Sequence, residues 1–266
     1  MALRALSMAA TGGRAMMDQV DTIANNLANV NTTAYKRTRA NFSDLFYQQV
    51  RRAGHGEPGY NQSPTGQFFG TGVRLTSTEK LFHQGALNRT ERDLDLAIDG
   101  EGFLRVRLPD DALFYTRAGN LNIDAEGHLV TADGYPLDPP VRIPREITRI
   151  FIDPTGRVQG LDPEDPQELR ELGRLELTRF VNPSGLEAAG DNLYRETPAS
   201  GPRLDGEPGL DEGFGRLRQG FLEQSNVDVI KELVDLISAQ RAFEINTKSI
   251  ETADQILQTV NTLRRS

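Results

Sequence analysis

Residues 227–263 read VDVIKELVDLISAQRAFEINTKSIETADQILQTVNTL and contain neither glycine nor proline. Apolar side chains recur in this run at spacings of three and four residues, which predicts one long amphipathic helix. One stripe consists of Leu233, Leu236, Gln240, Phe243, Thr247, Ile250, Asp254 and Leu257. A second consists of Ala239, Ala242, Asn246, Ser249, Ala253, Ile256, Val260 and Leu263. Two partly apolar stripes indicate that the helix has more than one packing neighbour.

The first 30 residues carry a related pattern, which predicts a second amphipathic helix. Its heptad-like stripe consists of Leu3, Leu6, Ala10, Gly13, Met17, Val20, Ala24 and Leu27. Gly12 and Gly13 weaken this helix by roughly 1 kcal/mol each relative to alanine, but they permit close approach of another backbone. Paired with each other, the two terminal helices would form a hairpin whose remaining stripe needs other subunits. Alternatively, both helices cover the middle of a monomer.

The middle of the chain is punctuated by turn-forming residues. All 14 prolines lie between Pro58 and Pro208, and 23 of the 25 glycines lie between Gly54 and Gly220. The alternation of apolar and charged residues over 104–108 predicts a strand with one face buried. Further strands are expected at 113–116, 122–124, 128–131, 147–152, 157–160, 172–180 and 193–196. The layout of helix, β-rich middle and helix predicts an α+β fold.

Composition excludes several classes of function. The net charge is −8 and the acidic residues in excess lie in the middle, which argues against nucleic acid as a partner. The chain lacks cysteine and has three scattered histidines, so we expect no disulfide and no metal site. No apolar run reaches 18 residues, so we expect no membrane insertion. Arg4, Arg14 and Asp18 interrupt the N-terminal apolar stretch, which argues against a cleaved signal peptide.

No motif for catalysis stands out. Asp99-Gly-Glu-Gly-Phe103 lacks the third glycine and the Lys-Ser/Thr of a phosphate-binding loop, so a tight turn is the better interpretation. No serine lies in a G-x-S-x-G context. We therefore expect no catalytic residue and no cofactor. A peptidoglycan hydrolase with Glu101 as its acid is the enzymatic alternative, motivated only by the acidic middle.

Several separated motifs, in the same order, resemble those of the bacterial flagellar axial proteins, which build the rod and hook. The first is Ala24-Asn-Asn-Leu-Ala-Asn-Val-Asn-Thr32, followed by Thr33-Ala-Tyr-Lys-Arg37, where many members have glycine in place of Ala34. The C-terminal motifs are Gln219-Gly-Phe-Leu-Glu-Gln-Ser-Asn-Val227 and Gln240-Arg-Ala-Phe-Glu244, with Phe243 where tyrosine is usual. Asp99–Phe103, Tyr115-Thr-Arg-Ala-Gly119 and Gly127-His-Leu-Val-Thr131 resemble turns of the family's β domain.

The resemblance implies a structural subunit of a tubular polymer and not an enzyme. Residues 1–33 and 222–266 would be coiled-coil-like helices lining the inner tube, residues 34–70 an extended connecting stretch, and residues 71–221 an outer β-rich domain. Subunits of this family are exported through the flagellar type III apparatus without a cleaved signal peptide. The implied location is the flagellar basal body, across the periplasm.

Within the family, the chain most resembles the distal-rod type, because residues 46–70, before Gly70-Thr-Gly-Val73, look like the extra stretch that keeps the rod straight. The implied partners are copies of the chain, proximal rod proteins below, hook protein above and the surrounding ring proteins. A proximal rod or hook-type subunit is the structural alternative.

Two sets of residues are predicted to carry assembly. The predicted assembly interface consists of Leu3, Leu6, Met17, Val20, Leu27, Asn25, Asn26, Asn29, Leu233, Leu236, Phe243, Ile250 and Leu257. The predicted rod-straightening residues are Phe46, Tyr47, Tyr60, Phe68 and Phe69.

Overall fold

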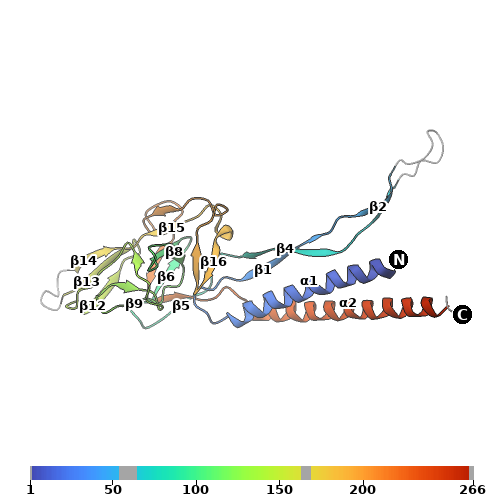
Figure 1. The fold of residues 1–266 in the computed structure, drawn as a ribbon. Coiled ribbons are helices and arrows are strands. Elements are labelled where there is room, and N and C mark those ends of the chain that lie inside the picture. Colours follow the sequence, from blue (N-terminus) through green and yellow to red (C-terminus); the bar gives the residue numbers. More distant parts are fainter. Residues whose placement is uncertain (1, 54–64, 163–168, 264–266) are drawn as a thin grey trace. The chain divides into compact units, whose positions relative to one another are not determined.

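The computed structural model describes residues 2–53, 65–162 and 169–263, and it confirms the predicted α+β class (Figure 1). The helices are α1 (Ala2–Ala28) and α2 (Val229–Leu263). The first six strands are β1 (Thr38–Asp44), β2 (Gln48–Arg51), β3 (Gln67–Phe69), β4 (Val73–Lys80), β5 (Leu87–Arg89) and β6 (Leu96–Asp99). The next are β7 (Phe103–Arg107), β8 (Leu113–Thr116), β9 (Asn122–Ile123), β10 (Leu129–Val130), β11 (Leu137–Asp138), β12 (Arg149–Ile152) and β13 (Arg157–Leu161). The last are β14 (Leu169–Arg174), β15 (Leu177–Arg179), β16 (Glu187–Gly190), β17 (Leu193–Arg195), β18 (Leu204–Gly206), β19 (Arg216–Gln219) and β20 (Phe221–Glu223), with a 3₁₀ turn at Pro183–Gly185.

The chain divides into two compact units. The helical unit comprises residues 1–28, 38–79 and 228–266, and the β unit comprises residues 29–37 and 80–227. The three-part division predicted from the sequence stays a prediction.

In the helical unit, α1 and α2 run antiparallel, side by side (Figure 1). Asn26, near the end of α1, donates a hydrogen bond of 3.1 Å to Glu232 in the first turn of α2. Near the middle of α1, a Cβ at Gly12 would lie 3.0 Å from Asn246 Oδ1, farther along α2. Gly12 therefore permits the close approach that the sequence indicated, whereas a Cβ at Gly13 would lie 3.8 Å from Phe243, at ordinary contact distance.

A second face of α1 is covered by the ribbon of strands β1 to β4, in which β1 pairs with β4 and β2 with β3. The Arg4 guanidinium lies 5.3 Å from the centroid of the Phe69 ring, and the Thr11 hydroxyl accepts a 3.5 Å hydrogen bond from the Val73 amide. Asn26 pairs with the Thr38 backbone through two hydrogen bonds of 2.8 Å. Thus α1 is held between α2 and the ribbon, and Asn26 bonds to both.

The first turn of α2 is capped by Asp228. Its carboxylate accepts hydrogen bonds from the amides of Ile230 and Lys231, at 3.0 and 3.3 Å. Asn226, which precedes the helix, does not cap it. Asn226 instead bonds to Arg37, Leu81 and His83, which leaves the carboxylate two residues later to meet the free amides of the first turn.

The β unit is built around a sheet in the order β16-β17-β8-β7-β15-β18, with β11 also pairing with β7. At the centre of this sheet, β7 pairs antiparallel with β8 on one side and with β15 on the other. Leu104, Val106, Leu129 and Leu177 are buried in the main core. A separate aromatic cluster is formed by Phe103, Tyr115, Phe180 and Tyr194, with edge-to-face contacts among its rings.

The expectation that the strand at 104–108 has a solvent-exposed charged face was wrong for Arg105. This side chain is only 7% exposed and its guanidinium bonds to Glu176 and Asp205, each at 2.7 Å, and to Asp138 at 3.2 Å. A buried charge is tolerated where it is paired in this way. The predicted strand at 172–180 is divided into β14 and β15, which belong to different sheets.

We predict that Asn26→Ala destabilises the helical unit by about 1–3 kcal/mol, because buried donors and acceptors of Glu232 and Thr38 lose their partner. Urea unfolding followed by far-UV circular dichroism measures the change. Asn25→Ala serves as the matched control, since Asn25 is on the same helix but exposed. Equal losses for the two variants would contradict a specific role of Asn26.

Candidate assembly surfaces

On α1, the predicted interface residues occupy different environments. Leu6, Val20 and Leu27 are half-buried, Met17 and Asn25 are exposed, and Asn26 is fully buried. Asn29 follows the helix and accepts a hydrogen bond from the Thr32 hydroxyl, and Leu3 lies within α1. Only part of this set is therefore available to another molecule, and Asn26 has an intramolecular role.

On α2, the most buried side chains are Glu232, Ala239 and Ala253. They are spaced by multiples of seven residues, so they form one line along the helix, on which Asn246 also lies against Gly12 of α1. The predicted Leu236, Ile250 and Leu257 are half-buried, and Leu233 and Phe243 are exposed. The line closest to α1 is thus small and polar, and the predicted leucine stripe lies beside it.

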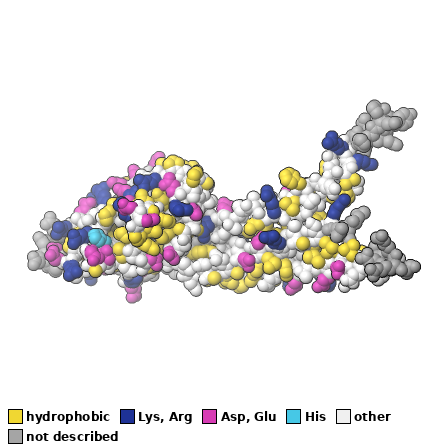
Figure 2. All heavy atoms as spheres, in the orientation of Figure 1, with side chains coloured by type: hydrophobic (Ala, Val, Ile, Leu, Met, Phe, Trp, Pro, Cys, Tyr) yellow, Lys and Arg dark blue, Asp and Glu magenta, His cyan; other side chains and the backbone are white. Residues whose placement is uncertain are grey.

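Sequence reasoning missed most of an exposed apolar stripe on α2, of which only Ile256 belonged to a predicted stripe. Ile230, Val234, Ile237, Ile245 and Ile256 are 76%, 57%, 50%, 66% and 53% exposed, respectively. Figure 2 shows hydrophobic side chains on the surface of the helical part of the chain. Arg241 and Lys248 fall on the same face and interrupt the pattern, which is why counting apolar residues alone did not select it. This amount of exposed aliphatic surface is typical of a face that packs against a partner.

A groove between α1 and α2 lies beside the predicted Met17, Val20 and Phe243. Its volume is about 390 Å³, and its other lining residues are Asp21, Gln240 and Glu244. The structure therefore brings together three of the predicted interface residues from the two helices, in an apolar depression bordered by two carboxylates.

The ribbon carries most of the predicted rod-straightening residues. Phe46 is 95% exposed, and Tyr47 and Phe68 are also exposed, whereas Phe69 is half-buried beneath Arg4. Tyr60 lies outside the described residues. Tyr47 bonds to Asp44, and this bond raises the pKa of the phenol. Exposed aromatic side chains in a two-stranded ribbon are suited to contact with another subunit.

In the β unit, a buried ionic cluster holds three distant parts of the chain together. The Lys36 ammonium lies 2.7 Å from Glu223 Oε1, and the Arg117 guanidinium lies 2.8 Å from Glu223 Oε2. All three side chains are almost completely buried. Lys36 also donates to the His83 carbonyl, and Arg117 donates to the Gly102 carbonyl. Each charged group of the cluster thus bonds to at least one oppositely charged group and each cation also to a backbone carbonyl, as burial of charge requires.

The two cations of this cluster share one carboxylate, and burial together with these neighbouring charges shifts the pKa values of Lys36 and Glu223. Burial, followed by the nearby charge of Arg117, lowers the pKa of Lys36 to about 8. Burial acts to raise the pKa of Glu223, but Arg117 and Lys36 outweigh it, so that pKa is lowered. Because its folded pKa lies below its unfolded value, Glu223 stabilises the fold above its ordinary pKa, and this contribution is lost as the pH falls through the folded value.

The cluster lies in a junction that we define as residues 33–37, 80–86 and 220–227. Asn226 joins all three segments, accepting from the Arg37 amide at 2.7 Å and donating to the carbonyls of Leu81 and His83. Ala34 is buried there with a positive φ of 56°, and its amide donates to the Glu223 carbonyl. Glycine adopts this conformation without the cost of roughly 1–2 kcal/mol that alanine incurs.

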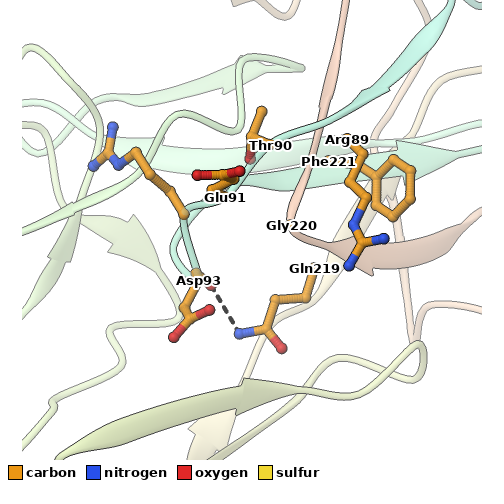
Figure 3. Close-up of a pocket in the computed structure, with 8 residues that line it drawn as sticks. Arg89, Thr90, Glu91, Asp93, Gln219, Gly220 and Phe221 are labelled. Atoms are coloured by element: carbon orange, nitrogen blue, oxygen red, sulfur yellow. Dashed lines mark hydrogen bonds between the residues drawn. The ribbon is translucent and has the colours of Figure 1, made fainter.

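A cavity of about 870 Å³ in the β unit is polar and open (Figure 3). Gln219 lies at its edge and donates to the carbonyls of Asp93 and Ile150, at 2.8 and 2.7 Å, while accepting from the Ile152 amide. Its side-chain amide therefore links β12 to the loop that contains Asp93. Arg89, Glu91 and Arg92 complete a mixed-charge lining without a convergent set of catalytic groups.

The residues of the Asp99–Phe103 segment form a turn between two strands. Asp99 and Phe103 end β6 and begin β7, and Gly100 and Gly102 between them have positive φ, as the predicted turn requires. Glu101 is exposed and pairs with Arg179 at 2.9 Å. Among residues 2–53, 65–162 and 169–263, no group of three potential metal ligands occurs. Neither helix in this described part is apolar enough over a sufficient length to cross a membrane.

Family models of flagellar axial proteins match three parts of the chain. Residues 8–36 match the flagella basal body rod protein, residues 97–160 the flagellar hook protein FlgE/F/G D1 domain, and residues 218–263 the flagellar basal body rod FlgEFG protein C-terminal region. The matches include the Asn-rich end of α1, the centre of the β unit and α2. They define the class as the rod and hook proteins of the flagellum.

Whole-chain comparisons narrow this class. The flagellar basal-body rod protein FlgG of Borreliella burgdorferi is 45% identical, with 99% of each chain covered. FlgG of Buchnera aphidicola subsp. Schizaphis graminum is 47% identical, covering 95% of this chain and 96% of the relative. FlgG of Bacillus subtilis is 37% identical, covering 99% and 100%. The chain belongs to the FlgG family of flagellar basal-body rod proteins, and it is a structural protein and not an enzyme.

We predict that Glu223→Gln destabilises the β unit by about 3–5 kcal/mol, because Lys36 and Arg117 are left as buried like charges. Chemical unfolding at neutral pH measures the loss. The difference from the unsubstituted chain should shrink as the pH falls below about 4.3, the ordinary pKa of glutamate.

The control for this prediction is Glu101→Gln, which removes the same charge from a surface ion pair. It should change stability by no more than about 1 kcal/mol. A comparable loss in both variants would show that the buried cluster has no special weight.

Proposed function

We propose that the chain is a subunit of the distal rod, which assembles with copies of itself into a rigid hollow shaft that transmits motor torque through the periplasm to the hook. The observation that carries this proposal is the exposed aliphatic stripe on α2, which no other described residue covers. A helix that is apolar on more than one face requires more than one neighbour. Membership of a rod protein family makes further copies of the chain the natural neighbours.

In this proposal, α1 and α2 form the coiled-coil-like inner wall of the tube, and the β unit forms the outer part. Proximal rod proteins would lie below, hook protein above and ring proteins around the shaft. Export without a cleaved signal peptide belongs to the same proposal. The antiparallel packing of α1 and α2 supports it, because a helix pair with one free apolar face can be repeated around an axis.

The ribbon favours the distal-rod position over a proximal rod or hook-type position. It extends the helical unit with residues 38–79 and presents Phe46, Tyr47 and Phe68 to solvent. A two-stranded ribbon bearing exposed aromatic side chains gains stability by packing on another chain. Contacts of this kind between neighbouring copies would resist bending of the shaft.

We predict that deletion of residues 1–28 or of residues 229–266 abolishes polymerisation, because each removes one wall of the helix pair. Electron microscopy of concentrated protein detects tubes, and far-UV circular dichroism shows whether the β unit keeps its strands. Tubes formed by either truncated chain would contradict the proposal that the terminal helices carry assembly.

We predict that Phe46→Ser together with Phe68→Ser leaves assembly possible but yields bent or unstable polymers, because aromatic contacts of the ribbon are lost while its backbone is kept. Curvature measured in electron micrographs tests this. Phe151→Ser, which removes an exposed aromatic side chain from the β unit, is the matched control. Straight polymers from the double variant would favour another position along the flagellar axis.

A further inference from the structure

We propose that the exposed stripe on α2 of one copy seats in the groove between α1 and α2 of a neighbouring copy. The stripe is defined as Ile230, Val234, Ile237, Arg241, Ile245, Lys248 and Ile256. The groove is defined as Met17, Val20, Asp21, Gln240, Phe243 and Glu244. The inference rests on the proposed self-assembly and identifies the two faces that meet.

From Ile230 to Lys248 the stripe forms one continuous face of α2, and Ile256 follows about two turns later. Its successive members from Ile230 to Lys248 are separated by three or four residues, the spacing that keeps side chains on one side of a helix. All of them are exposed. The line that packs toward α1, with Glu232, Ala239 and Ala253, is buried. The stripe is therefore not the face that α1 covers.

The groove offers the kind of surface that this stripe needs. Met17 and Phe243 contribute exposed apolar area, and Val20 contributes a half-buried side chain. The groove has a volume of about 390 Å³. Aliphatic side chains such as Ile237 and Ile245 are suited to fill it.

Charge makes the pairing specific. The stripe carries Arg241 and Lys248, whereas the groove carries Asp21 and Glu244. Within the described part of the chain, none of these four side chains forms an ion pair with a partner closer than 4.0 Å. On contact between copies, the basic pair of one would meet the acidic pair of the other while the isoleucines meet Met17 and Phe243. Complementary charge fixes register and excludes wrong partners.

The same charges disfavour a symmetric contact. Two stripes facing each other would place Arg241 and Lys248 of one copy close to those of the other, and two grooves would do the same with carboxylates. A contact between two different faces is heterologous, and repeated heterologous contacts generate open helical filaments when they do not close. The inferred contact is therefore of the type that a growing shaft needs.

A cross-linking experiment tests the contact directly, because the chain contains no cysteine. Full-length Met17→Cys and Ile245→Cys chains are mixed, assembled and oxidised. We expect disulfide-linked dimers that join position 17 of one copy to position 245 of another, in several-fold excess over both like-with-like dimers. A statistical mixture, or an excess of 245–245 dimers, would overturn the inference. Lys231→Cys, paired with Met17→Cys, is the control from another exposed position of α2.

A charge exchange gives an independent test. Arg241→Glu and Asp21→Arg should each raise the protein concentration needed for assembly, by about tenfold or more, since like charges then meet. The double variant should recover most of this loss, whereas Lys231→Glu should change little. If the double variant assembles no better than the single variants, the inferred contact is wrong.

The outcomes of these experiments distinguish failure of the proposed contact from failure of the proposed rod function. Tubes that form without the 17–245 link and without charge rescue would overturn the contact and leave the rod subunit proposal standing. Failure of the unsubstituted chain to assemble at any concentration tested would count against both.

Discussion

The Glu223 carboxylate is completely buried, and groups from three separate segments of the β unit bond to it. Its two oxygens face Lys36 and Arg117, and one also accepts from the Gly85 amide. A buried carboxylate without these partners would cost several kcal/mol. The segments that contain Lys36 and Glu223 immediately follow the N-terminal part of the chain and precede α2. The requirement for paired charge thus holds the entry and exit of the β unit together, although they are almost 190 residues apart.

The helical unit also contains a buried carboxylate, that of Glu232, which bonds to a buried side chain. Asn26 and Glu232 meet in the buried contact between α1 and α2, and Asn26 also binds the Thr38 backbone. The line of α2 that faces α1 continues with alanines. Small and polar groups bring helices close but bury little apolar area, so this pair gains only part of its stability from its own contact. Larger aliphatic side chains remain on the outside, where another subunit can cover them.

The sequence predicted those parts of the fold whose signals are local. The terminal helices follow from long runs with regular spacing, and the strand at 113–116 was placed correctly because turn residues bound it. The burial of Arg105 was not predicted, because its three acidic partners are distant in the sequence. Asp138 lies in β11, Glu176 precedes β15 and Asp205 lies in β18, and no local pattern reveals them. The line of α2 that faces α1 was not predicted for a related reason. Apolar periodicity selects leucine and isoleucine, whereas the buried line contains glutamate and alanine. The interface residues chosen from the sequence stay a prediction. The buried ion pair of Lys36 and Glu223 is visible only in the structure, because each is an ordinary charged residue in the sequence.

Arg241 and Lys248 give the exposed stripe a property that a purely aliphatic row would lack. Aliphatic rows attract one another in many registers and in symmetric pairs, and a symmetric pair closes on itself. A subunit that must add at one end of a polymer needs a surface that prefers a different face of its neighbour. Basic residues within the stripe, together with Asp21 and Glu244 beside the groove, supply that preference at the expense of some apolar area. The interruption that hid the stripe from apolar counting is therefore what gives the contact its direction.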